Sequence, residues 1–234
     1  MSAVLSACQV TSCVQEQAWN EACLARPVAR PSLQLWRYAG PGVVLGRRQY
    51  ALAQGGRLPG ADDLVVRGAG GGAVLTGPWM LSASILLPPD HPLLGTGVVA
   101  SYRWLGVLHA GLLRDLGIDA HALSPEAVRR HDATGDVPWA CFGGLSPWEV
   151  AVGGRKIVGL AQVRRKQGVL LASGTLVSAP AWQVLCDALG QPAEDARRLA
   201  RLTTSCEEQL GAPVLMEVLA ERLSLALLDL LGPL

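Results

Sequence analysis

The sequence predicts an α+β fold. Segments with the period-two alternation of β-strands recur between residues 33 and 172, and helical spacing of apolar residues continues from about residue 181 to the C-terminus. Half of the 234 residues are hydrophobic and only 17% are charged, so the chain can bury a large core. We therefore expect a single domain over residues 1–234, with residues 181–234 as a helical segment packed on it.

The first part of the chain is expected to hold one helix and several short strands. Residues 14–26 have helical spacing, and the apolar side of this helix carries Val14, Ala18, Ala22 and Leu24. Strands are expected at residues 33–38, 43–46, 64–66, 73–75 and 81–87. The last two strands are expected to pair with each other across the turn at residues 77–78.

The second part of the chain is expected to combine a long helix, two hairpins and a helical end. Apolar residues at i, i+3 and i+4 predict a helix over residues 98–116, which ends at Gly117. Period-two segments flank turns at residues 153–154 and 166–168, so two successive hairpins are expected there. The final helices are expected at residues 181–189, 194–209 and 213–231.

Charge and composition exclude several classes of function. The net charge is +1 with both signs interspersed, so we expect no nucleic-acid partner. The N-terminus lacks the basic and apolar regions of a signal peptide, and no apolar run of roughly 18 residues predicts a membrane span. The six cysteines form no CxxC pair and match no common zinc pattern. We therefore expect a cytoplasmic protein with reduced thiols, no metal site and no membrane contact.

A glycine-rich segment, RGAGGGAV at residues 67–74, is the first candidate for a ligand site. Gly70, Gly71 and Gly72 allow positive φ angles and close approach of the backbone to a ligand. Such a row of amides can hold a phosphate or a carbonyl oxygen. The segment is not a Walker loop, because no Gly-Lys-Ser/Thr follows, and a strand rather than a helix comes next. A turn between two strands is the alternative interpretation. Arg47, after the strand at residues 43–46, can pair with an anionic ligand or simply face solvent.

A cysteine and a lysine mark the second candidate region, residues 140–174. Cys141 lies where an irregular segment meets a strand. Lys156 follows a tight glycine turn inside a strand rich in Ile, Val, Leu and Gly, and the facing strand carries Glu149. Because a buried ammonium is costly without a partner, Lys156 is a candidate for a ligand-directed role. An exposed lysine on an edge strand is the alternative.

The order of these motifs resembles that of the biotin/lipoate protein ligase superfamily. The matching stretches are residues 36–49, 65–77, 141–150, 153–165 and 170–176. The resemblance implies a mixed, mainly antiparallel sheet covered by helices, as in the catalytic domains of that superfamily. The segment around Lys156 is more similar to lipoate ligases and octanoyltransferases than to biotin ligases.

The same resemblance implies roles for individual residues. The lysine matching Lys156 contacts the acyl carbonyl or the acyl-adenylate, and the arginine matching Arg67 holds the anionic end of the acyl donor. Cys141 stands where ligase-like octanoyltransferases have their cysteine nucleophile. The implied substrate-binding residues are Arg47, Arg67, Gly70, Gly71, Gly72, Ala73, Gly159, Ala161 and Gln162. The sequence departs from the family pattern at Val66, Ala69 and Thr76, where many relatives have Arg, Ser or Thr, and His.

Three hypotheses follow from this reading. In the first, an acyltransferase moves an octanoyl or lipoyl group from acyl carrier protein, through a Cys141 thioester, onto a lysine of a lipoyl domain or of the glycine cleavage H protein. Lys156 is the second catalytic residue of this hypothesis, because its positive charge would polarise the donor carbonyl and favour the Cys141 thiolate. This reaction requires no cofactor and no histidine, and His91, His109, His121 and His131 all lie outside the motifs. We expect His109 to be a packing or solvent-facing residue.

The other two hypotheses give Cys141 no chemical role. In the second, an ATP- and Mg²⁺-dependent lipoate–protein ligase uses free lipoate, and Lys156, Arg47 and Arg67 hold a lipoyl-adenylate. In the third, the three departures from the family pattern leave a protein that binds an acyl group without catalysis.

Overall fold

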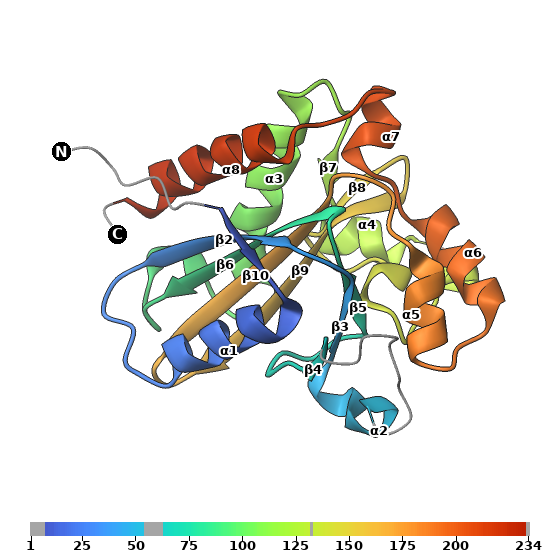
Figure 1. The fold of residues 1–234 in the computed structure, drawn as a ribbon. Coiled ribbons are helices and arrows are strands. Elements are labelled where there is room, and N and C mark those ends of the chain that lie inside the picture. The colour runs from blue at the N-terminus through green and yellow to red at the C-terminus, as the bar shows by residue number, and fades with distance from the viewer. Residues whose placement is uncertain (1–7, 54–62, 132, 233–234) are drawn as a thin grey trace.

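The computed structural model describes residues 8–53, 63–131 and 133–232. Within these ranges, the main sheet has seven strands in the order β1-β2-β6-β10-β9-β8-β7 (Figure 1). In this order the strands are β1 (Gln9–Thr11), β2 (Ser32–Tyr38), β6 (Met80–Leu87), β10 (Gly168–Leu176), β9 (Arg155–Arg165), β8 (Val150–Val152) and β7 (His121–Ala122). All neighbours pair antiparallel except β1 and β2, which are parallel. The predicted α+β class with a mixed, mainly antiparallel sheet is confirmed.

A smaller sheet is formed by β4 (Leu64–Val66), β3 (Gly42–Leu45) and β5 (Val74–Thr76). β3 is the central strand and is parallel to β4 and antiparallel to β5. The glycine-rich segment connects β4 to β5, so it lies at one end of this sheet. The strands predicted at residues 33–38, 43–46 and 64–66 are therefore present, and each observed end differs from the predicted one by no more than one residue.

The predicted pairing of residues 73–75 with residues 81–87 is wrong. The turn at Gly77 carries the chain from one sheet to the other, so β5 pairs with β3 whereas β6 pairs with β2 and β10. Every residue of β6 is buried. A fully buried strand is stabilised as a central strand with a neighbour on each side, which a two-stranded hairpin does not provide.

Helices cover both faces of the main sheet. α3 (Arg103–Arg114) and α8 (Met216–Leu231) lie on one face, and α1 (Cys13–Leu24) lies across the other (Figure 1). Leu105 and Leu113 of α3 and Leu223 of α8 share a core with the sheet. The remaining α-helices are α2 (Tyr50–Ala53), α4 (Pro125–Arg129), α5 (Trp182–Ala188), α6 (Ala193–Leu202) and α7 (Cys206–Leu210). α5 and α6 share a second core with the smaller sheet.

Two helix predictions need correction. The helix expected at residues 98–116 begins only at Arg103, after a short 3₁₀ turn, and is followed as expected by Gly117 at φ +89°. The helix expected at residues 194–209 is interrupted at residues 203–205, which separate α6 from α7. The interruption falls on Thr203 and Thr204, whose backbone pairs with β9 instead of continuing a helix. Both are β-branched or cap-forming residue types that favour non-helical backbone.

The histidine expected to be structural is a packing residue. His109 is buried, and its Nε2 lies 3.0 Å from the Ser173 hydroxyl. Burial lowers the pKa of His109 to about 4.

The expectation of a single domain over residues 1–234 stays a prediction. None of the helices within the described ranges is both long enough and apolar enough to span a lipid bilayer.

Candidate active site

Cys141 begins a 3₁₀ turn, η5 (Cys141–Gly143), that is joined to the glycine-rich segment. The Cys141 N–H donates to the carbonyl of Ala73 at 2.8 Å, and the Ala73 N–H donates to the carbonyl of Trp139 at 2.8 Å. These two bonds fix the cysteine turn against the start of β5. Cys141 is partly exposed, so its thiol is held on a rigid backbone without being sealed in the core.

The glycine-rich segment is shaped by an arginine from its own start. The Arg67 guanidinium donates to the carbonyls of Gly70 and Gly72, both at 3.0 Å. Gly71 has φ +93°, a conformation that residues with a side chain rarely adopt. Arg67 therefore closes this loop on itself, in addition to any contact with a ligand.

Gly72 lies too close to the cysteine turn for any side chain. A Cβ there would come within 2.6 Å of the carbonyl carbon of Ala140 and 2.7 Å of the Cys141 nitrogen. Both neighbours are backbone atoms and cannot move aside independently. A glycine is required at this position by the packing of the loop on the cysteine turn.

Substituting this glycine provides a stability prediction. We expect Gly72→Ala to lower the free energy of unfolding by about 1–3 kcal/mol, because the added methyl overpacks the junction. The matched control is Gly70→Ala, two residues away, where a Cβ would meet nothing within 4 Å. Thermal unfolding of both variants tests this, and equal melting temperatures would contradict it.

Lys156 is the most deeply buried charged residue of the region. It is 1% exposed, and its Nζ lies 2.6 Å from Oε2 of Glu149 and donates to the carbonyl of Cys141 at 2.7 Å. The ammonium also lies 5.5 Å from the centre of the Phe142 ring. The exposed-lysine alternative is therefore wrong, and the ammonium contacts the main chain of the cysteine turn.

Glu149 is the residue whose importance the sequence did not reveal. Its carboxylate accepts from the Ser146 N–H at 2.8 Å as well as pairing with Lys156. Burial raises the pKa of Glu149, and the Lys156 ammonium opposes that rise. The alternation of residues 148–152 placed Glu149 on the strand facing Lys156, but did not show that both would be buried. The cysteine turn contacts the pair through the carbonyl of Cys141 and the ring of Phe142.

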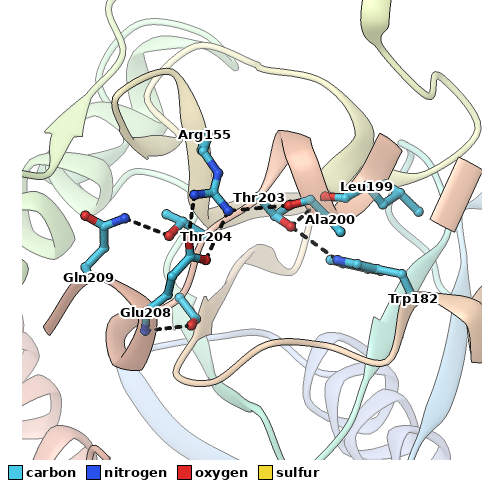
Figure 2. A network of polar contacts seen from close by, with 9 residues as sticks. Arg155, Trp182, Leu199, Ala200, Thr203, Thr204, Glu208 and Gln209 are labelled. Carbon is cyan, nitrogen blue, oxygen red and sulfur yellow. Dashed lines mark hydrogen bonds and ion pairs between the residues drawn. The ribbon is translucent and has the colours of Figure 1, made fainter. Parts of the chain in front are cut away.

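The interruption between α6 and α7 belongs to a network of polar contacts that includes Arg155, Thr203 and Thr204 (Figure 2). The Thr204 N–H donates to the carbonyl of Lys156 at 3.0 Å, and Thr203 forms an isolated bridge with the same residue. The Thr203 hydroxyl accepts from the Trp182 indole at 3.2 Å. Arg155, the neighbour of Lys156, forms a two-pronged ion pair with Glu208 of α7. The C-terminal helices thus hold the start of β9 in place.

A largely apolar cavity lies between α1, the glycine-rich segment and β9 and β10. Its lining includes the apolar side chains Val44, Val74, Met80, Phe142, Leu160, Val163 and Leu170. Such a lining suits a saturated acyl chain, because sites for small molecules are lined predominantly by apolar side chains. Cys141 lies on the wall of this cavity.

A second, open pocket has a more polar lining and shares Cys141 with the apolar cavity. It is lined by Gly70, Gly71 and Gly72 and by the carboxylates Asp136 and Glu149. The residues common to both spaces are Arg67, Cys141, Leu160, Ala161 and Gln162. The thiol-bearing residue therefore lies at the junction of an apolar cavity and an open, more polar pocket.

The structure brings together most but not all of the residues singled out from the sequence. Gly159, Ala161 and Gln162 line the apolar cavity, and Ala73 anchors the cysteine turn. Arg47 is exposed, and its side chain is absent from the described lining of both spaces. Its position reflects a 3₁₀ turn after β3 that directs the residue toward solvent. Ala69 and Thr76, two of the three residues at which the sequence departs from the family pattern, line the apolar cavity.

The predicted apolar side of α1 is right at its two ends and wrong in between. Leu24 is buried and Val14 packs against the second core, but Ala18 and Ala22 are exposed. Their places against the protein are taken by Glu16 and Asn20, which are buried and line the apolar cavity. A hydrogen bond of 2.7 Å from the Tyr38 hydroxyl to Glu16 compensates for the burial of that carboxyl.

Glu16 provides a pH-dependent prediction. Burial raises the pKa of its carboxyl above the ordinary 4.5. Between that value and the raised one, the native state holds a proton that the unfolded chain has lost, so stability falls as pH rises through this window. We expect the melting temperature of Glu16→Gln, relative to that of the wild type, to increase as pH rises above 4.5. Parallel curves across that window would contradict it.

The amino-acid sequence is similar to those of known proteins. A family model described as the lipoyl protein ligase A/B catalytic domain matches residues 13–227. The chain belongs to this family. It is 31% identical over 216 residues to octanoyltransferase LipM of Kyrpidia tusciae. The aligned residues cover 86% of this chain and 76% of that protein. It is 33% identical over 190 residues to octanoyltransferase LipM of an Exiguobacterium species, covering 76% of this chain but only 66% of that protein.

The fold of the lipoyl protein ligase family is also found by structure comparison. The bipartite lipoate protein ligase of Thermoplasma acidophilum, described together with its E2 lipoyl domain, superposes with a TM-score of 0.66. The match covers 95% of this chain and 81% of that one at 17% identity, so it shows a common fold. The family predicted from the motifs of residues 33–177 is therefore confirmed.

Lipoate-protein ligase A, which superposes on this chain with a TM-score of 0.64 at 19% identity, has been solved bound with ATP. The glycine-rich segment of this chain supplies backbone amides to the open pocket, but a triphosphate also needs cations to offset its charge. Here the Asp136 carboxylate lines the pocket, and the Lys156 ammonium is already paired with Glu149. Arg67 is the arginine that lines both spaces, and it is bonded to the glycine loop. We therefore derive no reaction step through ATP.

Proposed function

We propose that this chain is an octanoyltransferase that moves an octanoyl or lipoyl group onto a lysine of a lipoyl carrier domain through a Cys141 thioester. The observation that carries the proposal is the position of Cys141 at the junction of the two spaces. The apolar cavity holds the acyl chain, and the open pocket admits first the donor and then the acceptor. The relatives described as octanoyltransferases support the same reaction.

The first half-reaction forms the acyl-enzyme. The sulfur of Cys141 attacks the thioester carbonyl of the acyl donor, an acyl carrier protein, and the bond between that carbonyl and the carrier sulfur breaks. The proton lost by Cys141 ends on the departing carrier thiol. Gly71 and Gly72 line the pocket together with Cys141, and in this proposal their backbone N–H groups stabilise the negative charge on the carbonyl oxygen.

The second half-reaction transfers the acyl group to protein. The neutral amine of a lysine, on a lipoyl domain or on the glycine cleavage H protein, attacks the new thioester. An amide forms, the bond to the Cys141 sulfur breaks, and the amine proton restores the thiol. Lys156 acts in both steps as a positioning residue, because its ammonium bonds the carbonyl of Cys141.

The test is the acyl-enzyme itself. The purified protein is incubated with octanoyl acyl carrier protein and its intact mass is measured. We expect one octanoyl adduct, which hydroxylamine or an acceptor lipoyl domain removes. An adduct that remains unchanged in Cys141→Ser, or its absence in the wild type, would reject the covalent mechanism.

The same preparation distinguishes the two other hypotheses. An ATP-dependent lipoate ligase would release pyrophosphate when lipoate, ATP and Mg²⁺ are supplied, and would lipoylate a carrier domain without an acyl donor protein. A protein that only binds acyl groups would do neither, yet would still bind octanoate in calorimetry.

A further inference from the structure

A carboxylate and a histidine at the open pocket have no role in the transfer described above. Asp136 lines this pocket together with Cys141. The Nε2 of His131 lies 3.3 Å from Oδ1 of Asp136, and the two side chains are 25% and 20% exposed. Both residues belong to the segment between α4 and the cysteine turn. A partly exposed acid in the wall of the pocket can contact a substrate that enters it.

The backbone fixes Asp136 against the cysteine turn. The N–H of Val137, the next residue, donates to the carbonyl of Gly143 at 2.6 Å. A Cβ on Gly144 would come within 2.7 Å of Oδ2 of Asp136, so the bare backbone of this pocket-lining residue leaves room for that oxygen. The position of the carboxylate relative to Cys141 is therefore set by a short, hydrogen-bonded stretch of chain.

Oδ2 of Asp136 is free to bind a ligand. Within the described ranges no donor contacts this oxygen, and it is not one of the polar atoms that are sealed from solvent without a partner. The other charges of the pocket are already used. Glu149 is paired with the Lys156 ammonium at 2.6 Å, and the Arg67 guanidinium is bonded to carbonyls of the glycine-rich segment. A carboxylate without a Lys or Arg partner attracts a cation from solution.

The acceptor of the proposed transfer is such a cation when it arrives. A lysine side chain has an ordinary pKa of about 10.4, so at neutral pH nearly all of it is ammonium. An ammonium has no lone pair and cannot attack a thioester. One proton must therefore leave the acceptor nitrogen before the second half-reaction, and a group that binds the ammonium is in position to receive it.

We propose that Asp136 binds the ammonium of the acceptor lysine through Oδ2 and takes its first proton, and that His131 is a positioning residue that holds Oδ1. One N–H bond of the ammonium breaks, and the proton passes to Oδ2 and from there to water in the open pocket. The lone pair left on nitrogen attacks the Cys141 thioester, and the second proton restores the Cys141 thiol as the amide forms. The inference rests on the proposed function, because it assigns a residue to the second half-reaction.

The test measures the two half-reactions separately. Intact mass follows formation of the adduct from octanoyl acyl carrier protein, and then its discharge by the acceptor lipoyl domain. In Asp136→Asn we expect unchanged formation and a discharge about 10²-fold slower than in the wild type, the loss typical of a missing general base. His131→Ala should slow the same step by a smaller factor. Discharge at the full rate in Asp136→Asn, or an equal loss in both half-reactions, would overturn the inference.

Hydroxylamine separates a catalytic role from structural damage. It is a largely neutral nucleophile at neutral pH, so it needs neither a carboxylate to bind it nor a base to activate it. Its discharge of the adduct should therefore proceed at the same rate in the wild type, Asp136→Asn and His131→Ala. A slower rate in the variants would show a distorted thioester site and would count against the inference.

Two further variants make the test specific. The methyl of Gly144→Ala would meet only the side chain of Asp136, which can rotate away, so the protein should remain folded while discharge by the acceptor again slows selectively. The matched control is Asp119→Asn. Asp119 also lies beside a histidine, His121, at 3.6 Å, but is absent from the described lining of both spaces. This control should keep both rates, and a selective loss of discharge in it would contradict a role specific to Asp136.

Failure of the inference and failure of the proposed function give different results. If no donor acylates the wild type, the proposed function fails, but calorimetry with the unmodified lipoyl domain still tests Asp136. The wild type should bind this domain about tenfold more tightly than a variant whose acceptor lysine is replaced by glutamine, and Asp136→Asn should bind the two equally. Equal affinities in the wild type would reject the inference. Octanoyl adducts that Asp136→Asn discharges at the wild-type rate would reject it and leave the transferase proposal intact.

Discussion

Replacing the sulfur of Cys141 is expected to lower the rate of acyl transfer by at least about 10³-fold, since the reaction loses the atom that forms the covalent intermediate. Both Cys141→Ser and Cys141→Ala should show this loss in carrier-domain acylation. The melting temperature should change little, because the side chain is partly exposed and the turn is held by backbone bonds. Initial rates with octanoyl acyl carrier protein measure the effect.

A second cysteine provides the matched control. Cys23 at the end of α1 is also partly buried, but lies on a separate surface groove rather than on the acyl cavity. Cys23→Ser should keep the wild-type rate and the octanoyl adduct. If Cys141→Ala retained more than about a tenth of the activity, an effect of less than 1.4 kcal/mol on the barrier, a thioester at this position would be excluded.

Breaking the buried ion pair is expected to have the largest effect on stability. Lys156→Met leaves the Glu149 carboxylate buried without its cation, and Glu149→Leu leaves the ammonium without its anion. Loss of one partner of a buried pair costs about 3–5 kcal/mol. Both single variants should therefore unfold at clearly lower denaturant concentration than the wild type.

The double variant separates stability from positioning. Lys156→Met combined with Glu149→Leu removes both charges, so it should recover most of the stability lost by either single variant. It should not recover activity, because the carbonyl of Cys141 has lost its hydrogen bond from Lys156. Chemical denaturation and the rate of adduct formation measure the two effects. Recovery of both together would contradict a positioning role for Lys156.

Much of the fold could be predicted from local patterns. The hairpin of β8 and β9 and that of β9 and β10 follow from period-two segments around short turns, and both are present. The family was predicted from the glycine-rich segment and the residues around Lys156, and the family match confirms it. The pairing of β5 was not predictable, because a turn containing Gly77 fits a hairpin as well as a change of sheet.

The site was predictable in its residue types but not in its contacts. The sequence singled out Cys141 and Lys156, yet it gave no reason to expect that the ammonium would bond the cysteine carbonyl instead of facing a substrate. It also placed Ala18 and Ala22 of α1 against the protein, where the structure has Glu16 and Asn20. A pattern of apolar residues identifies the buried side of a helix only where the buried side chains are apolar. The burial of Glu16 and Asn20 was therefore not predicted.

The amino-acid sequence alone determined the secondary structure of most segments, the family and the chemical groups available for acyl transfer, because these depend on neighbours along the chain and on motifs. Only the tertiary structure decided which groups meet. Glu149 and Lys156 form a buried pair whose ammonium also donates to the carbonyl of Cys141, and the backbone of Lys156 is bonded to that of Thr204, which leaves the helical path. Such contacts depend on the free energy of packing segments that are distant in the sequence, and local sequence patterns do not predict this free energy.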